Sequence, residues 1–250
     1  MKLSKSNKAV MFLSIVTATI IFSPASVSAM HIMEGYLPLG YCIAWGAACA
    51  PFLAAGFVRL RRTLHENKRA FILLAMSGAY VFVISSFKIP SITGSSSHMT
   101  GAGLAAILFG VSATSVLAVI VLIFQAIFIA HGGLTTLGAN LFAMGVMGPL
   151  LTVALFKAGK KIRINRSANV FTATALGCLF TYCITAFQLA VAYPAESGGV
   201  AASLLKFLGV FAPTQIPLAV VEGILTVLVV IGMDNFAREE LSSISFTETK

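Results

Sequence analysis

Charged residues are scarce in this chain. Of its 250 residues, 10% are charged and 58% are hydrophobic, whereas a soluble domain carries about 25% charged and roughly 45–50% apolar residues. This deficit excludes a soluble protein of this size and predicts an all-α, polytopic membrane protein. The net charge of +9 comes mainly from two short segments and the first residues. It indicates the cytoplasmic face of a membrane protein, not a nucleic-acid partner.

Several chemical motifs are also missing. The chain has no G-x-x-x-x-G-K-[ST] phosphate loop, so any ATP must be hydrolysed by another subunit. It has no G-x-S-x-G elbow, which leaves an intramembrane hydrolase pairing Ser97 with His98 as a minor alternative. The cysteines lack C-x-x-C spacing, which predicts neither a zinc site nor a disulfide framework. They are Cys42, Cys49, Cys178 and Cys183. We therefore do not expect an enzyme.

Long apolar segments predict the membrane crossings, since a spanning helix needs about 20 apolar residues. The clear candidates are Leu37–Val58, Ala70–Phe87, Leu137–Phe156, Ala168–Ala192 and Pro213–Met233. A further apolar stretch, Gly101–Ala130, is too long for one crossing and short for two.

Charge decides how this stretch is divided. Basic clusters at 59–69 and 157–166 both belong in the cytoplasm, so an even number of crossings must separate them. We expect a short helix from Gly101 to Phe109, a break at Gly110 and Ser112, and a full helix up to Ala130. A helix this short requires shielding by other protein or a cavity. The total becomes seven crossings, with an external loop over 193–212 and a cytoplasmic C-terminus.

The first 29 residues have the pattern of a cleaved signal peptide. The basic start contains Lys2, Lys5 and Lys8. An apolar run from Ala9 to Phe22 follows, and small residues lead to Ala29. We expect cleavage after Ala29, which leaves residues 30–250 as one integral-membrane, metal-binding domain with its N-terminus outside.

Cleavage at this point creates a possible nitrogen chelate. The α-amine of Met30, the amide nitrogen of His31 and His31 Nδ1 can close two rings around one cation. A Ser-, Thr- and Gly-rich loop over 89–101 lies on the same side and contains His98, which can add a fourth nitrogen. Four nitrogens in a plane suit Ni(II) and Cu(II). The alternative is an incidental histidine after the signal peptide and a loop histidine satisfied by hydroxyl groups.

Other polar residues admit less specific interpretations. His65 lies in a cationic segment, which disfavours a bound cation. We expect His131 to form a helix cap or a loop contact, although it is also a possible ligand. Gln125 and Asn140 are typical of contacts between membrane helices.

Glu222 is a membrane carboxylate, expected near water in the outer half of the last crossing, with a structural or a functional role. An alanine-rich face between 44 and 55 is either an internal seam or a partner surface.

Three blocks of sequence resemble one known family. They are residues 30–38 (MHIMEGYLP), 86–98 (SFKIPSITGSSSH) with Thr100-Gly101, and the run from Gln125 through HGGLTTLGAN at 131–140. The family is CbiM, the cobalt-transport M proteins, which are substrate-specificity subunits of energy-coupling-factor (ECF) ABC transporters. The resemblance covers essentially the whole mature chain. Met99 departs from it, because a proline is expected there.

The resemblance implies a seven-helix subunit in the bacterial cell membrane that captures Co2+ for cobalamin synthesis. It implies three partners: the coupling protein CbiQ, the ATPase CbiO and the small membrane protein CbiN. Related nickel subunits bind their metal through the residues equivalent to Met30, His31 and His98. Since nitrogen sites bind nickel more tightly than cobalt, a Ni2+-specific subunit remains an alternative. A stand-alone divalent-cation carrier or channel is a second alternative, disfavoured because Glu222 is nearly alone as a membrane acid.

Overall fold

A computed structural model describes residues 31–66, 68–90 and 96–244. The predicted signal peptide at 1–29 and Met30 lie outside these residues. The long helices are α2 (Leu39–Glu66), α3 (Lys68–Ser86), α5 (Val111–Phe128), α7 (Gly148–Lys161), α8 (Arg166–Ala192) and α9 (Gly199–Phe236). Shorter elements are α4 (Ala102–Phe109), α6 (Leu137–Leu141), the π-helix η1 (Phe142–Met147), α10 (Arg238–Ser243) and the strands β1 (Lys88–Pro90) and β2 (Ser96–His98).

The described chain is almost entirely helical, as the composition predicts. Five helical segments are long and apolar enough to span a membrane, one of them the continuous run Leu137–Lys161 through α6, η1 and α7. A shorter apolar helix covers Ala70–Ser86. Part of the expected 89–101 loop instead forms a small antiparallel ladder, in which Lys88 pairs with His98.

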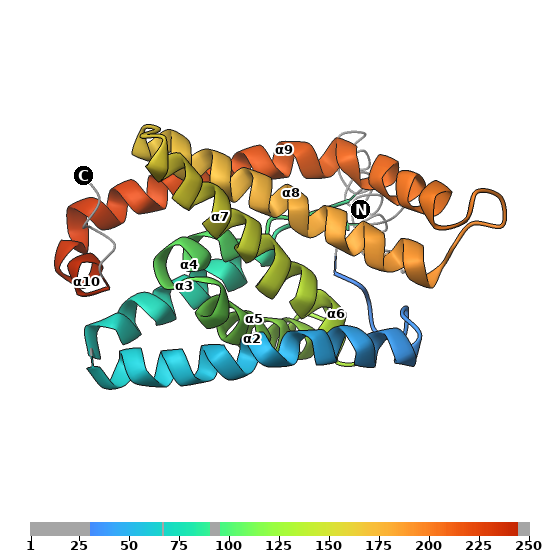
Figure 1. Ribbon diagram of the computed structural model, residues 1–250, viewed down its shortest axis with the longest axis horizontal. Coiled ribbons are helices and arrows are strands. Elements are labelled where there is room, and N and C mark those ends of the chain that lie inside the picture. The colour runs from blue at the N-terminus through green and yellow to red at the C-terminus, as the bar shows by residue number, and fades with distance from the viewer. Residues whose placement is uncertain (1–30, 67, 91–95, 245–250) are drawn as a thin grey trace, which may run out of the picture.

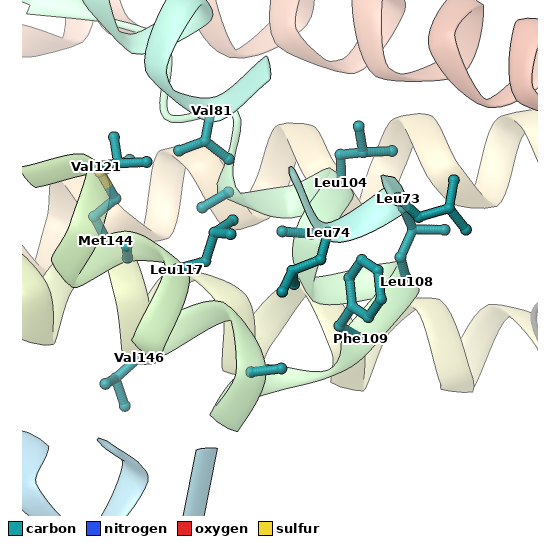
Figure 2. Packing of buried hydrophobic residues seen from close by; sticks show 14 of the residues in the cluster. Leu73, Leu74, Val81, Leu104, Leu108, Phe109, Leu117, Val121, Met144 and Val146 are labelled. Atoms are coloured by element: carbon teal, nitrogen blue, oxygen red, sulfur yellow. The ribbon is translucent and has the colours of Figure 1, made fainter. Parts of the chain in front are cut away.

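The division of the 101–130 stretch agrees with the prediction. α4 ends at Phe109, Gly110 forms the break with φ 81°, and α5 begins at Val111. A side chain at Gly110 would adopt a strained backbone and would contact the Arg59 guanidinium. Residues of α3 and α5 pack against α4 in an apolar cluster (Figure 2), and α7 and α8 also contact α4. The short helix is therefore shielded by protein, which is the condition for its occurrence in a membrane.

The expected external loop over 193–212 is wrong for most of its length. α9 begins at Gly199 and continues for 38 residues, with Pro213 and Pro217 inside it. A helix of this length measures about 57 Å, nearly twice the thickness of a bilayer core. The crossing expected from Pro213 begins earlier because the mainly apolar residues from Gly199 to Ala212 extend the helix before the prolines.

The two basic segments lie at the same end of the bundle. The end of α2, the start of α3, the turn between α7 and α8, and α10 gather at one end, whereas the α8–α9 connection lies at the other (Figure 1). An ion pair of 2.9 Å between Arg166 and Asp234 joins the start of α8 to the end of α9 at the basic end. This arrangement agrees with the even number of crossings that the charge pattern requires.

The alanine-rich face of α2 is not an internal seam. Its exposed members are Ala44, Ala47, Ala50, Ala54 and Ala55. The buried side of α2 instead contains Cys49 and Gly56, and Gly46 lies against Gly138 of α6. A Cβ on Gly138 would be 2.6 Å from the Gly46 Cα, so this crossing depends on two glycines.

Candidate metal site

Three buried histidines from distant parts of the chain meet at one point. His31 precedes α2, His98 ends β2, and His131 lies between α5 and α6. The side chains are 3%, 1% and 1% exposed, respectively. His31 Nδ1 is 2.6 Å from His98 Nε2 and 3.0 Å from His131 Nε2. One ring nitrogen from each histidine lies within 4.8 Å of the other two, close enough for the three to hold a single metal ion.

Asn140 of α6 positions His31 through the next residue. Its amide oxygen accepts the Ile32 N–H at 2.7 Å, and its amide nitrogen donates to the Ile32 carbonyl at 3.0 Å. Thr136 donates its hydroxyl to the same carbonyl at 2.6 Å. The two Asn140 bonds imitate strand pairing and fix the backbone on one side of His31. Asn140 is thus a positioning residue, a more specific role than the helix contact that the sequence suggested.

Two side chains of α9 hold the segment around His98. Gln215 donates to the His98 carbonyl at 3.3 Å. The Glu222 carboxylate accepts the Thr100 N–H at 2.6 Å, the Thr100 hydroxyl at 2.7 Å and the Gly101 N–H at 3.0 Å. Gln215 and Glu222 are seven residues apart, which places them on one face of the helix. The backbone from His98 to Gly101 is therefore anchored to α9.

Glu222 is fully buried, so the expectation that water reaches it is wrong. Its oxygens are occupied by backbone and hydroxyl donors at the start of α4, a use of a carboxylate that a helix N-terminus favours. This structural role follows from its partners at Thr100 and Gly101, which the sequence of α9 alone does not reveal.

Hydrogen bonding defines the state of the His98 ring. Its Nδ1 lies 2.7 Å from the Met99 carbonyl, which can only accept a hydrogen bond. Nδ1 therefore carries the proton, and the lone pair of Nε2 points toward His31. A second bond of this kind is the usual means of orienting a metal-binding imidazole.

Burial keeps the three imidazoles neutral. It lowers the pKa of His98 to about 4 and that of His131 to about 2, and it holds the pKa of His31 well below its ordinary value of 6.5. The charge of Lys88, the strand neighbour of His98, lowers all three further. Neutral imidazoles have free lone pairs, which is the form that binds a metal ion.

A small cavity adjoins the rings of His31 and His98. Its volume is about 10 Å³, and its lining includes His31, His98, Thr100, Asn140 and Met144. That volume accommodates about one water-sized object. The site is thus sized for a single ion, not for an organic substrate.

The structure brings together two of the three predicted ligands, His31 and His98, while Met30 lies outside the described residues. It adds His131, whose side chain we expected in a cap or loop contact. Gln125 makes the expected contact between helices, since it donates to Ser85 of α3 at 2.6 Å. His65 is exposed at the end of α2.

The hydrolase alternative fails on geometry. The Ser97 hydroxyl is 2.7 Å from the Thr214 hydroxyl. Both nitrogens of His98 are directed elsewhere, toward His31 and Met99. All four cysteines are free thiols.

Comparison with known proteins gives a consistent result. The family model described as CbiM, the cobalt uptake substrate-specific transmembrane region, matches residues 31–240. A cobalt transport protein CbiM of Lachnoclostridium phytofermentans is 58% identical over 222 residues, which cover 89% of this chain and 88% of that protein. A cobalt transport protein CbiM of Clostridium cellulovorans is 48% identical over 239 residues, covering 96% and 91%.

A solved structure has the same fold. The crystal structure described as a truncated transition metal transporter superposes with a TM-score of 0.72 at 24% identity. The match covers 82% of this chain and 98% of that chain.

Proposed function

The chain belongs to the CbiM family of cobalt uptake proteins, and we propose that it is the Co2+-capture subunit of an ATP-driven ECF-type importer. It is a multi-pass membrane transport component. In this proposal the cation is the transported cargo, and no cofactor takes part. The imported cobalt supplies cobalamin synthesis.

The proposed ligands are the α-amine of Met30, the amide nitrogen and Nδ1 of His31, and Nε2 of His98. The observation that carries the proposal is the 2.6 Å separation between His31 Nδ1 and His98 Nε2. In such a chelate His98 occupies the corner opposite the amide and next to Nδ1. With metal–nitrogen bonds of about 2.0–2.1 Å, neighbouring corners are about 2.9 Å apart and opposite corners about 4.1 Å. The observed separation therefore supports the neighbouring position.

The chemistry of the donors supports a transition metal. Within the described residues, the metal-ligand cluster consists only of histidines. Ca2+ and Mg2+ require oxygen ligands, so this set of neutral nitrogens discriminates against them. Imidazole nitrogens suit the later first-row ions, among which nickel is bound more tightly than cobalt in general. A Ni2+-specific subunit of the same class is accordingly the second candidate.

The proposed mature chain is residues 30–250, with its N-terminus outside and its C-terminus in the cytoplasm of a bacterial cell. The gathering of both basic segments at one end supports this orientation, because Lys and Arg accumulate on the cytoplasmic side (Figure 1). Seven crossings result if the short α4 counts as one of them.

The proposed partners are CbiQ, CbiO and CbiN, with ATP hydrolysis on CbiO. A stand-alone carrier is less well supported, because Glu222 is fully engaged by Thr100 and Gly101. Transport into vesicles by the purified chain without ATP would support that alternative and contradict the capture-subunit assignment.

The test is metal binding by protein whose Met30 terminus has been verified by intact mass. We expect one equivalent of Co2+ to bind, and we expect H31A and H98A to abolish tight binding of both Co2+ and Ni2+. H65A is the matched control, because His65 is exposed and lies at the basic end. Unchanged binding by H31A and H98A would refute the site.

A further inference from the structure

The three imidazoles are nearly equally spaced. Their ring centroids are 4.4 Å apart for His31 and His98, 4.6 Å for His31 and His131, and 4.7 Å for His98 and His131. Three ligands at mutual right angles place imidazole centroids about 4.5 Å apart, whereas tetrahedral ligands place them about 5.2 Å apart, for metal–nitrogen bonds of about 2.0–2.1 Å. The arrangement is that of an octahedral or square-pyramidal corner.

Two of the rings lie edge to edge in a nearly common orientation. The planes of His31 and His98 differ by 8°. Face-to-face stacking would keep their atoms about 3.5 Å apart, yet two of their nitrogens are 2.6 Å apart. The rings therefore meet at their edges, as adjacent ligands in one plane do.

The ring of His131 is turned out of that common orientation, and the four planar positions are already assigned to the chelate and His98, so a fifth nitrogen would bind on the axis. The His131 ring is inclined by 71° to His31 and by 75° to His98. Its Nε2 is 3.0 Å from His31 Nδ1, close to the separation of about 2.9 Å expected for an axial and an equatorial nitrogen.

The backbone turns His131 toward this point. Ala130 has φ 47°, a conformation uncommon for a residue with a side chain, and Gly132 has φ 75°. The His131 N–H donates to the Gln125 carbonyl at 3.1 Å, which ties the turn to the end of α5. A simple helix cap does not require a buried imidazole in this position.

We propose that His131 Nε2 is a fifth, axial ligand and that it favours Co2+ over Ni2+. This inference rests on the proposed function, because the plane is formed by the processed terminus, His31 and His98. In this inference His131 supplies the preference for Co2+ over Ni2+ that the planar nitrogens do not supply.

The two ions differ in a strong planar field of four nitrogens. Ni(II), with eight d electrons, fills the orbital that points along the axis, and two electrons oppose an axial lone pair. Low-spin Co(II), with seven, has a single electron in that orbital, so an axial nitrogen binds it more strongly. The axial imidazole therefore opposes the general preference of nitrogen sites for nickel.

The first test is electron paramagnetic resonance of the Co(II)-loaded chain beginning at Met30, kept free of oxygen. The unpaired electron lies along the axis, so one axial nitrogen splits the axial cobalt lines into triplets. We expect these triplets in the unmodified protein and their loss in H131A. A low-spin spectrum without triplets, or a high-spin spectrum, in the unmodified protein would overturn the inference.

The second test compares the affinities of Co2+ and Ni2+ by competition. Loss of outer-shell partners alone costs about 10- to 100-fold in metal affinity, so we expect H131A to lower the Co2+/Ni2+ affinity ratio at least about tenfold. H131Q repeats the measurement with a polar side chain of similar reach, and H65A is expected to leave the ratio unchanged.

The outcomes separate this inference from the proposed function. If H131A and H131Q keep the ratio of the unmodified protein while H98A loses both metals, the axial role is wrong and the planar site stands. If H98A and H31A bind both metals normally, the planar site is wrong and the axial role is refuted with it.

Discussion

Removal of the Asn140 side chain is expected to weaken metal binding without direct contact with the metal. In N140A the buried Ile32 N–H loses its acceptor at 2.7 Å, while the Ile32 carbonyl keeps the Thr136 hydroxyl at 2.6 Å. One stranded buried donor costs about 1–3 kcal/mol. If all of this cost falls on the docked N-terminal segment, Co2+ affinity drops by about 5- to 150-fold. Competition titration of the chain beginning at Met30 measures the loss.

N169A is the matched control. Asn169 is equally buried and donates to the Phe156 carbonyl at 2.8 Å, but it lies near the basic end. We expect it to lower the thermal midpoint while Co2+ affinity stays the same. N140D keeps an acceptor for the Ile32 N–H and places a carboxylate oxygen against the Ile32 carbonyl, so an intermediate affinity is expected. Equal affinities for N140A and the unmodified protein would refute the argument that this amide positions His31.

Three further predictions test the site from other directions. One extra residue before Met30 removes the α-amine from its place, so Co2+ affinity should fall at least about 100-fold; equal affinity would exclude the chelate. Burial holds the pKa of His98 at about 4 and that of His131 at about 2, so these imidazoles do not bind protons between pH 6 and 8. The α-amine has an ordinary pKa of about 7.7–8.0 and does bind a proton in this range. Affinity measured by titration should therefore fall by about ten- to a hundredfold per unit as pH drops below 7.5, and a flat profile would leave only imidazole ligands. E222Q leaves one buried backbone N–H facing a donor, so the free energy of unfolding should fall by about 1–3 kcal/mol, and Co2+ affinity should fall with it. E196Q, at the exposed Glu196, is the control. An unchanged thermal midpoint for E222Q would contradict the structural role of Glu222.

Sequence patterns predict the helical segments here because lipid imposes a simple rule. Every spanning segment must be apolar and must satisfy its own backbone, so length and charge parity were sufficient to place the break at Gly110 within one residue. The same rule puts the start of α9 at Pro213, whereas the helix begins at Gly199. Pro213 looks like a first-turn proline, but the apolar residues before it continue the helix, and sequence alone does not distinguish a proline that begins a helix from one inside it.

The site was partly accessible for a different reason. His31 and His98 were paired from their common side of the membrane, and the same topology placed His131 on that side. The side of the membrane on which His131 lies is thus a usable signal for a ligand, but the sequence does not reveal its contact with His31 and His98. That contact depends on the turn at Ala130 and on the packing of α5 against its neighbours, neither of which has a local sequence pattern.

The segments that contain His31 and His98 are held by different helices, α6 and α9. Asn140 ties Ile32, the residue after His31, to α6, whereas Gln215 and Glu222 tie the backbone from His98 to Gly101 to α9. The two nearest ring nitrogens, 2.6 Å apart, are therefore held from opposite sides of the site. A displacement of α9 relative to α6 by about 1 Å along the line that joins the nitrogens changes their separation by more than a third, well away from the value of about 2.9 Å that adjacent ligands of one ion require. The same hydrogen bonds that make the site rigid thus make ion binding depend on the relative position of two helices.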